Sequence, residues 1–230
     1  MKKILYIVLD GLGDLPLKQL GDKTPLEAAV TPNMDRLAQK GKTGIVYPVG
    51  KGIAPESDIA VISLLGYDAH KYYTGRGPLE SFAEGLAVND GDAALRVNFA
   101  TVAEDGKTIQ DRRVGRNLTT EEAAGLAKEI NAKVTLSSAT FEFKSTIGHR
   151  GILVIRGMHQ KLSGWITNTD PAYGREGVFG VAKEKFANLV AVSAPMPGYE
   201  HSQEAQEASK LLNEFTEKSI KVLNESGINK

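Results

Sequence analysis

The chain of 230 residues contains no cysteine. Disulfide bonds, thiolate metal ligands and a cysteine nucleophile are therefore excluded. An excess of charge of one sign is also missing, because 28 lysine and arginine residues balance 28 aspartate and glutamate residues. This balance gives no electrostatic case for a nucleic-acid partner or for binding to a membrane surface.

Long hydrophobic runs are lacking as well. The apolar run of residues 4–9 is too short for a signal peptide or a membrane span, and it ends at Asp10. We therefore expect no targeting segment, no membrane partner and a cytoplasmic location. Internal repeats and low-complexity tracts are absent from the sequence, whose length is sufficient to bury the core of one or two domains.

Residues 4–9 consist of strand-forming residues in an unbroken run, which is typical of a central strand in a parallel sheet. Asp10 then follows at the carboxyl end of that strand, where open α/β sheets bind their ligands. Its carboxylate can pair with a bound cation. It can equally cap a turn formed with Gly11 and Gly13, and the local sequence does not separate the two interpretations.

The first ninety residues predict an alternation of strands and helices. Threonine-proline pairs predict helices that begin near Pro25 and Pro32, and residues 43–49 predict a second strand. Together these elements indicate an α/β layer. Glycines on both sides of Arg76 predict a loop that presents its guanidinium to a phosphate or carboxylate, although a solvated turn fits equally well.

Ser57 lies where a loop rich in glycine and proline meets an apolar segment. The helical spacing of Ile59, Ile62 and Leu65 predicts a helix that begins at Ser57. A hydroxyl there lies beside unpaired N–H groups and the positive end of the helix dipole, which favour a phosphate or an oxyanion. Serines that only cap a helix are more common than nucleophiles, so this segment alone favours a cap.

Residues 91–190 have a different pattern. Apolar residues alternate with polar ones over 95–99, which predicts a half-buried antiparallel strand. Further elements are expected as two strands at 134–143 and 152–155, a helix at 119–130 and a long amphipathic helix at 202–225. We therefore expect an α+β domain at 91–190, inserted into a core formed by 1–90 and 191–230.

The most concentrated group of charges is Asp111-Arg112-Arg113-Val114-Gly115-Arg116. Guanidinium groups bind phosphates and carboxylates in a fork geometry, and an adjacent aspartate can orient a guanidinium or a substrate hydroxyl. A solvated charged loop is the alternative, which the local sequence somewhat favours. His149 and Arg150 come just before a predicted strand, where a histidine is more often structural than catalytic.

Several segments in order resemble one enzyme family. Val8-Leu9-Asp10-Gly11, 31–38 and 55–58 resemble the opening of an alkaline-phosphatase-superfamily metalloenzyme. Segments that continue the pattern are similar to archaeal-type 2,3-bisphosphoglycerate-independent phosphoglycerate mutases, and they lie at 57–68, 73–80, 98–102, 111–116, 149–151 and 213–215. This resemblance implies an α/β fold: a partial alkaline-phosphatase-like parallel-sheet domain with an inserted α+β substrate-binding domain.

The resemblance also implies an activity and a site. The enzymes interconvert 3-phosphoglycerate and 2-phosphoglycerate, a reaction of glycolysis and gluconeogenesis, through a metal-dependent phosphoserine intermediate. Ser57 would be the nucleophile and a metal ligand, and Asp10 would be a second ligand of divalent metal ions such as Mn, Mg, Zn or Co. The implied substrate-binding residues are Asp111, Arg112, Arg113, Arg116, His149 and Arg150.

The sequence departs from the family in its ligands. Most metal ligands of the family come as Asp-x-x-x-His or Asp-His clusters, and this chain contains neither. Ser226 and Gly227 also stand where the family has His-Pro. We therefore expect a C-terminally incomplete form that resembles the N-terminal half, with a second chain or segment supplying the rest. Alternatives are another phosphotransferase or phosphatase of the superfamily, or a non-catalytic remnant or binding domain.

Overall fold

The computed structural model describes residues 3–53, 55–177 and 179–229. The chain divides into two compact units, Met1–Leu65 and Gly66–Lys230. This division differs from the core and insertion expected from the sequence, and those domain boundaries stay a prediction.

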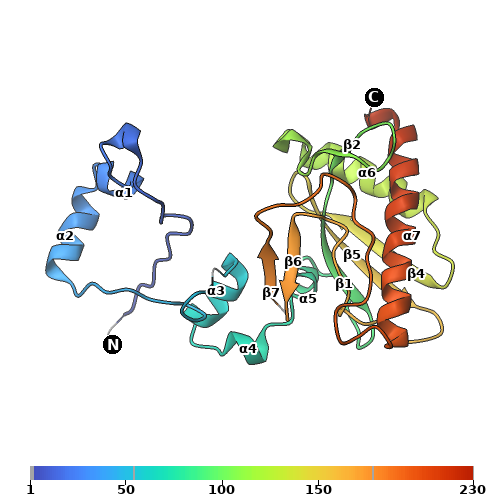
Figure 1. The fold of residues 1–230 in the computed structure, drawn as a ribbon, viewed down its shortest axis with the longest axis horizontal. Helices are drawn as coiled ribbons and strands as arrows, with labels where there is room; N and C mark the ends of the chain where they lie inside the picture. The colour runs from blue at the N-terminus through green and yellow to red at the C-terminus, as the bar shows by residue number, and fades with distance from the viewer. Residues whose placement is uncertain (1–2, 54, 178, 230) are drawn as a thin grey trace. The chain divides into compact units, whose positions relative to one another are not determined.

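The first unit consists of short helices joined by irregular segments (Figure 1). The helices are η1 (Lys18–Leu20), α1 (Pro25–Ala28), α2 (Pro32–Lys40) and α3 (Ser57–Leu64). Proline begins both α1 and α2, as predicted, because its fixed φ suits the first helical position and its missing N–H costs nothing there. Thr24 and Glu27 form a reciprocal capping box at the N-terminus of α1.

The two strands predicted in this unit are wrong for this chain. Neither 4–9 nor 43–49 forms a strand. Their apolar side chains face solvent: Ile4 is 94% exposed and Ile45 is 84% exposed. A central parallel strand takes its hydrogen bonds from neighbouring strands and is covered on both faces by helices, and the described residues supply neither to these segments.

The second unit contains the main sheet. Its three strands are antiparallel in the order β1–β5–β4, with bounds β1 (Ala93–Asn98), β4 (Ala139–Ser145) and β5 (Arg150–Gly157). The predicted strand at 95–99 is confirmed by β1, and 152–155 lies inside β5. Of the predicted strand at 134–143, only the second half pairs. Helices in both units and these strands confirm a mixed α/β chain.

The second unit also contains two hairpins. They pair β2 (Thr101–Val102) with β3 (Ile109–Asp111), and β6 (Tyr173–Glu176) with β7 (Phe179–Ala182). The 3-10 turn η2 (Val114–Arg116) comes two residues after β3. The charged segment 111–116 therefore runs from the end of β3 to the end of η2.

One face of the main sheet packs against two helices (Figure 1). These are α6 (Thr120–Lys133) and α7 (Gln203–Glu225), and the short turn η3 (Gly227–Asn229) contacts both. Leu153 and Ile155 of β5 share one apolar core with Leu126 and Leu211 of these helices. The predicted helix start at Thr119 is confirmed, because Thr119 and Glu122 form a capping box.

The other face of β1 and β5 contacts α5 (Arg76–Ala83), which follows α4 (Ala69–Tyr72). Gly77 allows this close approach, because a Cβ at that position would lie 1.9 Å from the carbonyl oxygen of Ala94. The predicted loop around Arg76 is wrong: Arg76 begins α5, and its Nε donates to Glu80 Oε1 at 2.7 Å, one turn later. Across the described residues, no helix is both long and apolar enough to span a bilayer.

Candidate functional site

Ser57 and Asp10 meet in the first unit. Helix α3 begins at Ser57, as predicted, and Glu56 holds the N-cap position. The Ser57 hydroxyl donates to Asp10 Oδ2 at 2.9 Å, across 47 residues of sequence. Its partner is thus a distant carboxylate, and a role as the cap of α3 does not account for this serine.

The pair offers two oxygen donors to a cation. Divalent metals in proteins take four ligands in zinc sites and six or more in magnesium or calcium sites. Within the described ranges, no group of three or more His, Asp or Glu side chains comes together to hold a metal. Asp10 and Ser57 fit the beginning of a metal site and do not complete one, so their roles as ligands stay predictions.

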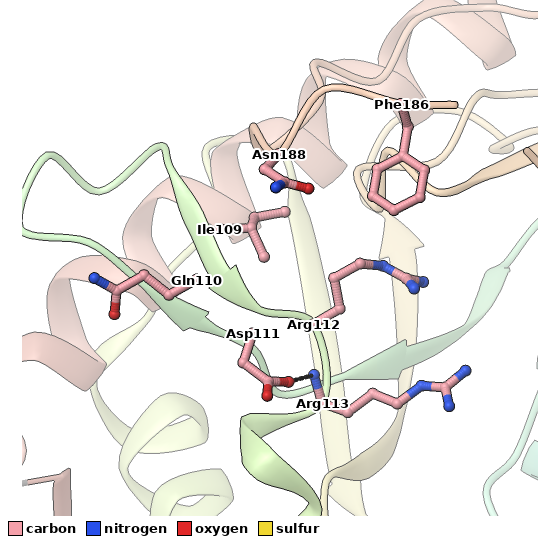
Figure 2. Close-up of a pocket in the computed structure, with 7 residues that line it drawn as sticks. All are labelled: Ile109, Gln110, Asp111, Arg112, Arg113, Phe186 and Asn188. Carbon is pink, nitrogen blue, oxygen red and sulfur yellow. Dashed lines mark hydrogen bonds between the residues drawn. The ribbon is translucent and has the colours of Figure 1, made fainter. Parts of the chain in front are cut away.

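The charged segment 111–116 forms a tight turn in the second unit. Asp111 Oδ1 accepts a hydrogen bond from the backbone N–H of Arg113 at 2.7 Å (Figure 2). Val114, Gly115 and Arg116 follow with φ of 51°, 60° and 56°. The left-handed region is unfavourable for a β-branched valine. The surroundings of the turn must therefore hold it in this shape.

Arg112 is held by an acidic partner. Its Nε donates to Asp170 Oδ1 at 2.8 Å and its Nη2 donates to Asp170 Oδ2 at 2.5 Å. The guanidinium carbon also lies 5.2 Å from the ring centroid of Tyr173 and 5.6 Å from that of Phe186. The hydrogen bonds to Asp170 raise the pKa of Arg112 above its ordinary value, so this group stays a cation.

An open pocket of about 440 Å³ lies beside the turn. Its lining residues come from β3, the start of the turn and the segment after β7, and they are Ile109, Gln110, Asp111, Arg112, Arg113, Phe186 and Asn188. Figure 2 shows the side chains of Arg112 and Arg113 extending in the same direction from the turn. Three of the predicted site residues, Asp111, Arg112 and Arg113, therefore line this pocket, and Arg116 is not among its lining residues.

His149 lies just before β5, inside a group of arginines. Burial lowers the pKa of His149, and so do four nearby positive charges, those of Arg150, Arg96, Arg113 and Arg116 in decreasing order. The fold thus brings the turn at 113–116 and the start of β5 to one place. We call His149 and these four arginines the cationic cluster.

Most of this positive charge has no ion-pair partner in the described part of the chain. Among the described residues, no carboxylate forms an ion pair with the guanidinium of Arg113, Arg116 or Arg150. Arg96 lies 3.8 Å from a carboxylate oxygen of Glu80. Like charges in one cluster repel one another, and an anionic ligand reduces that repulsion. Arginine forks match both phosphate and carboxylate groups.

Sequence reasoning missed three polar residues here. Arg96 and Asn98 reach the cluster because the register of β1 against β5 places Asn98 opposite Arg150. Within the described part of the chain, Asn98 Oδ1 is buried without a hydrogen-bond partner. Arg96 and Asn98 are the polar positions of the predicted strand at 95–99, and this alternation was the sequence signal that could have identified them. No local signal marks Asp170, which lies 58 residues from Arg112.

The predicted site residues therefore form two groups. Asp10 and Ser57 are hydrogen-bonded in the first unit. The other six lie in the second unit, where Arg113, Arg116, His149 and Arg150 share the cationic cluster. Asp111 bonds to the backbone of the turn, and Arg112 bonds to Asp170.

The cationic cluster can be tested by titrating His149 in the 230-residue chain by NMR. We expect a pKa below the ordinary 6.5. Arg150→Gln should raise it by removing one positive neighbour, and inorganic phosphate should raise it by neutralising several. Because the folded state resists protonation, the unfolded state binds the proton first as pH falls, so His149 lowers the stability of the fold below about pH 6.5.

Lys210→Gln is the control, because Lys210 lies on α7 and is not among the charges that shift this pKa. It should leave the titration of His149 unchanged. A His149 that titrates at 6.5 or above in both the unaltered chain and Arg150→Gln would contradict the cluster.

Comparisons with known proteins give one consistent family. Residues 38–229 match the family model described as 2,3-bisphosphoglycerate-independent phosphoglycerate mutase. A protein of that name from Aeropyrum pernix is 46% identical over 228 residues, which cover 99% of this chain and 52% of the relative. Another from Methanosphaera stadtmanae is 41% identical over 229 residues, which cover 100% of this chain and 51% of the relative.

Solved structures agree. The cofactor-independent phosphoglycerate mutase from Thermoplasma acidophilum superposes with a TM-score of 0.53 at 34% identity, over 96% of this chain and 53% of that one. The PH0037 protein from Pyrococcus horikoshii superposes with a TM-score of 0.60 at 28% identity, over 96% of this chain and 44% of that one. The chain spans about half the length of the curated relatives it matches.

Proposed function

The chain belongs to the 2,3-bisphosphoglycerate-independent phosphoglycerate mutase family, and on that premise we propose that the complete protein interconverts 3-phosphoglycerate and 2-phosphoglycerate. The observation that carries the proposal is the family match over residues 38–229, which includes Ser57, the turn at 111–116 and His149. The reaction belongs to glycolysis and gluconeogenesis, and we place it in the cytoplasm. Because the chain spans half of its relatives, the activity is proposed for a protein that also contains the other half.

Ser57 is the proposed nucleophile. Its Oγ forms a bond to the phosphorus of the substrate as the bond from phosphorus to the glycerate oxygen breaks, and the proton lost by the Ser57 hydroxyl balances the proton gained by the released glycerate hydroxyl. The same exchange in reverse transfers the phosphoryl group to the other hydroxyl and returns a proton to Ser57. The hydrogen bond to Asp10 supports this role, because it holds the hydroxyl in one orientation at the start of α3. The exposure of both side chains leaves the hydroxyl accessible to a substrate.

The cationic cluster is the proposed substrate site. Phosphoglycerate carries a phosphate and a carboxylate, and Arg113, Arg116 and Arg150 offer guanidinium groups without acidic partners among the described residues. After transfer to Ser57, glycerate must stay bound while it reorients. Arginines that hold its carboxylate and exclude water favour return of the phosphoryl group over hydrolysis. Asp111 is proposed to orient a substrate hydroxyl or the turn itself.

The missing half is proposed to supply the remaining metal ligands, with Asp10 and Ser57 as the contribution of this chain. A divalent ion would stabilise charge on the phosphoryl oxygens. The exposed apolar side chains of segments 4–9 and 43–49 support a second polypeptide or segment, since an exposed apolar surface is typical of a site that a partner covers. In the complete protein, 1–90 and 191–230 would then form the core and 91–190 the insertion.

The test compares two proteins. The chain alone should show no mutase turnover. The second protein is a fusion of this chain with the half of the Aeropyrum pernix relative that it does not match, and we call it the joined protein. It should interconvert the two phosphoglycerates without added 2,3-bisphosphoglycerate. Robust turnover by the chain alone would contradict an incomplete form. Release of inorganic phosphate from several phosphate esters, without isomerisation, would identify a phosphatase instead.

A further inference from the structure

Arg112 differs from the other arginines of its segment, because its charge is already paired. Two of its nitrogens donate to the two carboxylate oxygens of Asp170, at 2.8 and 2.5 Å. Such a two-point pair fixes the plane of the guanidinium as well as its position. Because these donors already bind Asp170, Arg112 has fewer donors left for an anionic ligand than Arg113 or Arg116.

Asp170 is itself fixed in place. Its Oδ1 also accepts a hydrogen bond from the backbone N–H of Ala172 at 3.0 Å. The rings of Tyr173 and Phe186 lie 5.2 and 5.6 Å from the guanidinium carbon of Arg112. Arg112 is therefore held by hydrogen bonds on one edge and by aromatic rings against the guanidinium, all from the segment 170–186.

This anchor lies immediately before the unfavourable part of the turn. Val114, Gly115 and Arg116 are all left-handed, with φ between 51° and 60°. Each such non-glycine residue costs about 1–2 kcal/mol and persists only where the surroundings enforce it. The turn carries Arg113 and Arg116, whose charges reach His149. A small shift of Arg112 would thus move both of them.

We propose that Asp170 is a positioning residue of the phosphoglycerate site: by holding Arg112 it fixes the turn that places Arg113 and Arg116 beside His149. Arg112 then acts through the turn and not as a contact of the substrate. The proposal rests on the proposed function for the identity of the ligand. Its geometric part, the placement of the turn, concerns this chain alone.

Asp170→Asn separates the two roles of Arg112. If Arg112 positions the turn, Asp170→Asn and Arg112→Gln should each raise the KM for 3-phosphoglycerate about tenfold in the joined protein, with a smaller change in kcat. The KM of the double variant should be no higher than that of either single variant, because both substitutions remove the same ion pair. If Arg112 instead contacts the substrate, Arg112→Gln raises KM while Asp170→Asn, which frees the guanidinium, leaves KM unchanged or lowers it. That second pattern would overturn the proposal.

The titration of His149 in the 230-residue chain gives a readout without substrate. Asp170→Asn should raise the pKa of His149 towards its ordinary value, because Arg113 and Arg116 move away. The Asp170 carboxylate is not among the charges that shift this pKa, so its own loss does not explain a change. An unchanged His149 pKa together with an unchanged KM would also overturn the proposal.

Two further variants complete the experiment. Asp170→Glu keeps the carboxylate and should recover part of the lost affinity. Asp90→Asn removes an exposed aspartate that pairs with Lys161 at 2.5 Å in the same unit, and it should change neither readout. An inactive joined protein would refute the proposed function while the His149 titration still decides the role of Asp170. Unfolding midpoints show whether each variant is folded.

Discussion

Ser57→Ala is expected to abolish mutase turnover of the joined protein, lowering kcat by a factor on the order of 10⁴ or more. The substitution removes the atom that accepts the phosphoryl group, and among the described residues Ser57 supplies the hydroxyl that is hydrogen-bonded to Asp10. Mass spectrometry of the unaltered protein mixed with substrate should find the phosphoryl group on the peptide that contains Ser57. The variant should carry none.

The structure indicates that a loss of turnover in Ser57→Ala would not result from unfolding of helix α3. Glu56, and not Ser57, holds the N-cap position of α3, and the Ser57 side chain is exposed. Ser57→Ala should therefore change the free energy of unfolding by no more than about 0.5 kcal/mol. Ser63→Ala, on the same helix, is the matched control and should keep full turnover. Turnover of Ser57→Ala within tenfold of the unaltered protein would exclude Ser57 as the nucleophile.

Local sequence patterns predicted the elements whose stabilising contacts are themselves local. The helix after Thr119 could be located because Thr119 and Glu122 satisfy backbone groups three residues apart. The long helix α7 follows the same logic, because Ser202 caps it, whereas α3 has no side-chain cap and was located by its apolar spacing. For these elements the signals that locate the helix lie within the segment itself, although packing against the main sheet also stabilises α6 and α7.

Elements that depend on distant residues were predicted less consistently: the strands at 95–99 and 152–155 found partners in β1 and β5, whereas those at 4–9 and 43–49 did not. Residues 4–9 have the composition of a buried strand, yet a strand forms only where another segment pairs with it. The partner of Arg112 shows the same limit, because Asp170 lies 58 residues away along the chain. The charged segment at 111–116 was identifiable from sequence, but the different roles of its arginines were not.

Ile155→Ala is expected to cost about 2–5 kcal/mol of the free energy of unfolding of the 230-residue chain. Ile155 is 0% exposed in β5, the central strand of the main sheet. It lies opposite Ala93 of β1 and Phe141 of β4, in the core that includes α6 and α7. Removing its side chain leaves a cavity that residues from four elements border, and a site enclosed on this many sides collapses poorly.

Ile147→Ala is the matched control, because it removes the same atoms from a side chain that is 67% exposed in the turn between β4 and β5. Its backbone carbonyl, which accepts from the N–H of Arg150 at 3.2 Å, is unaffected by the change. Urea denaturation followed by circular dichroism should show a loss within about 0.5 kcal/mol for this variant. Equal losses for the two variants would contradict the packing of the main sheet. A large loss for Ile155→Ala alone would show that packing in the second unit stabilises this chain. The second unit also contains the cationic cluster, so its stability would keep the cluster in place independently of the first unit.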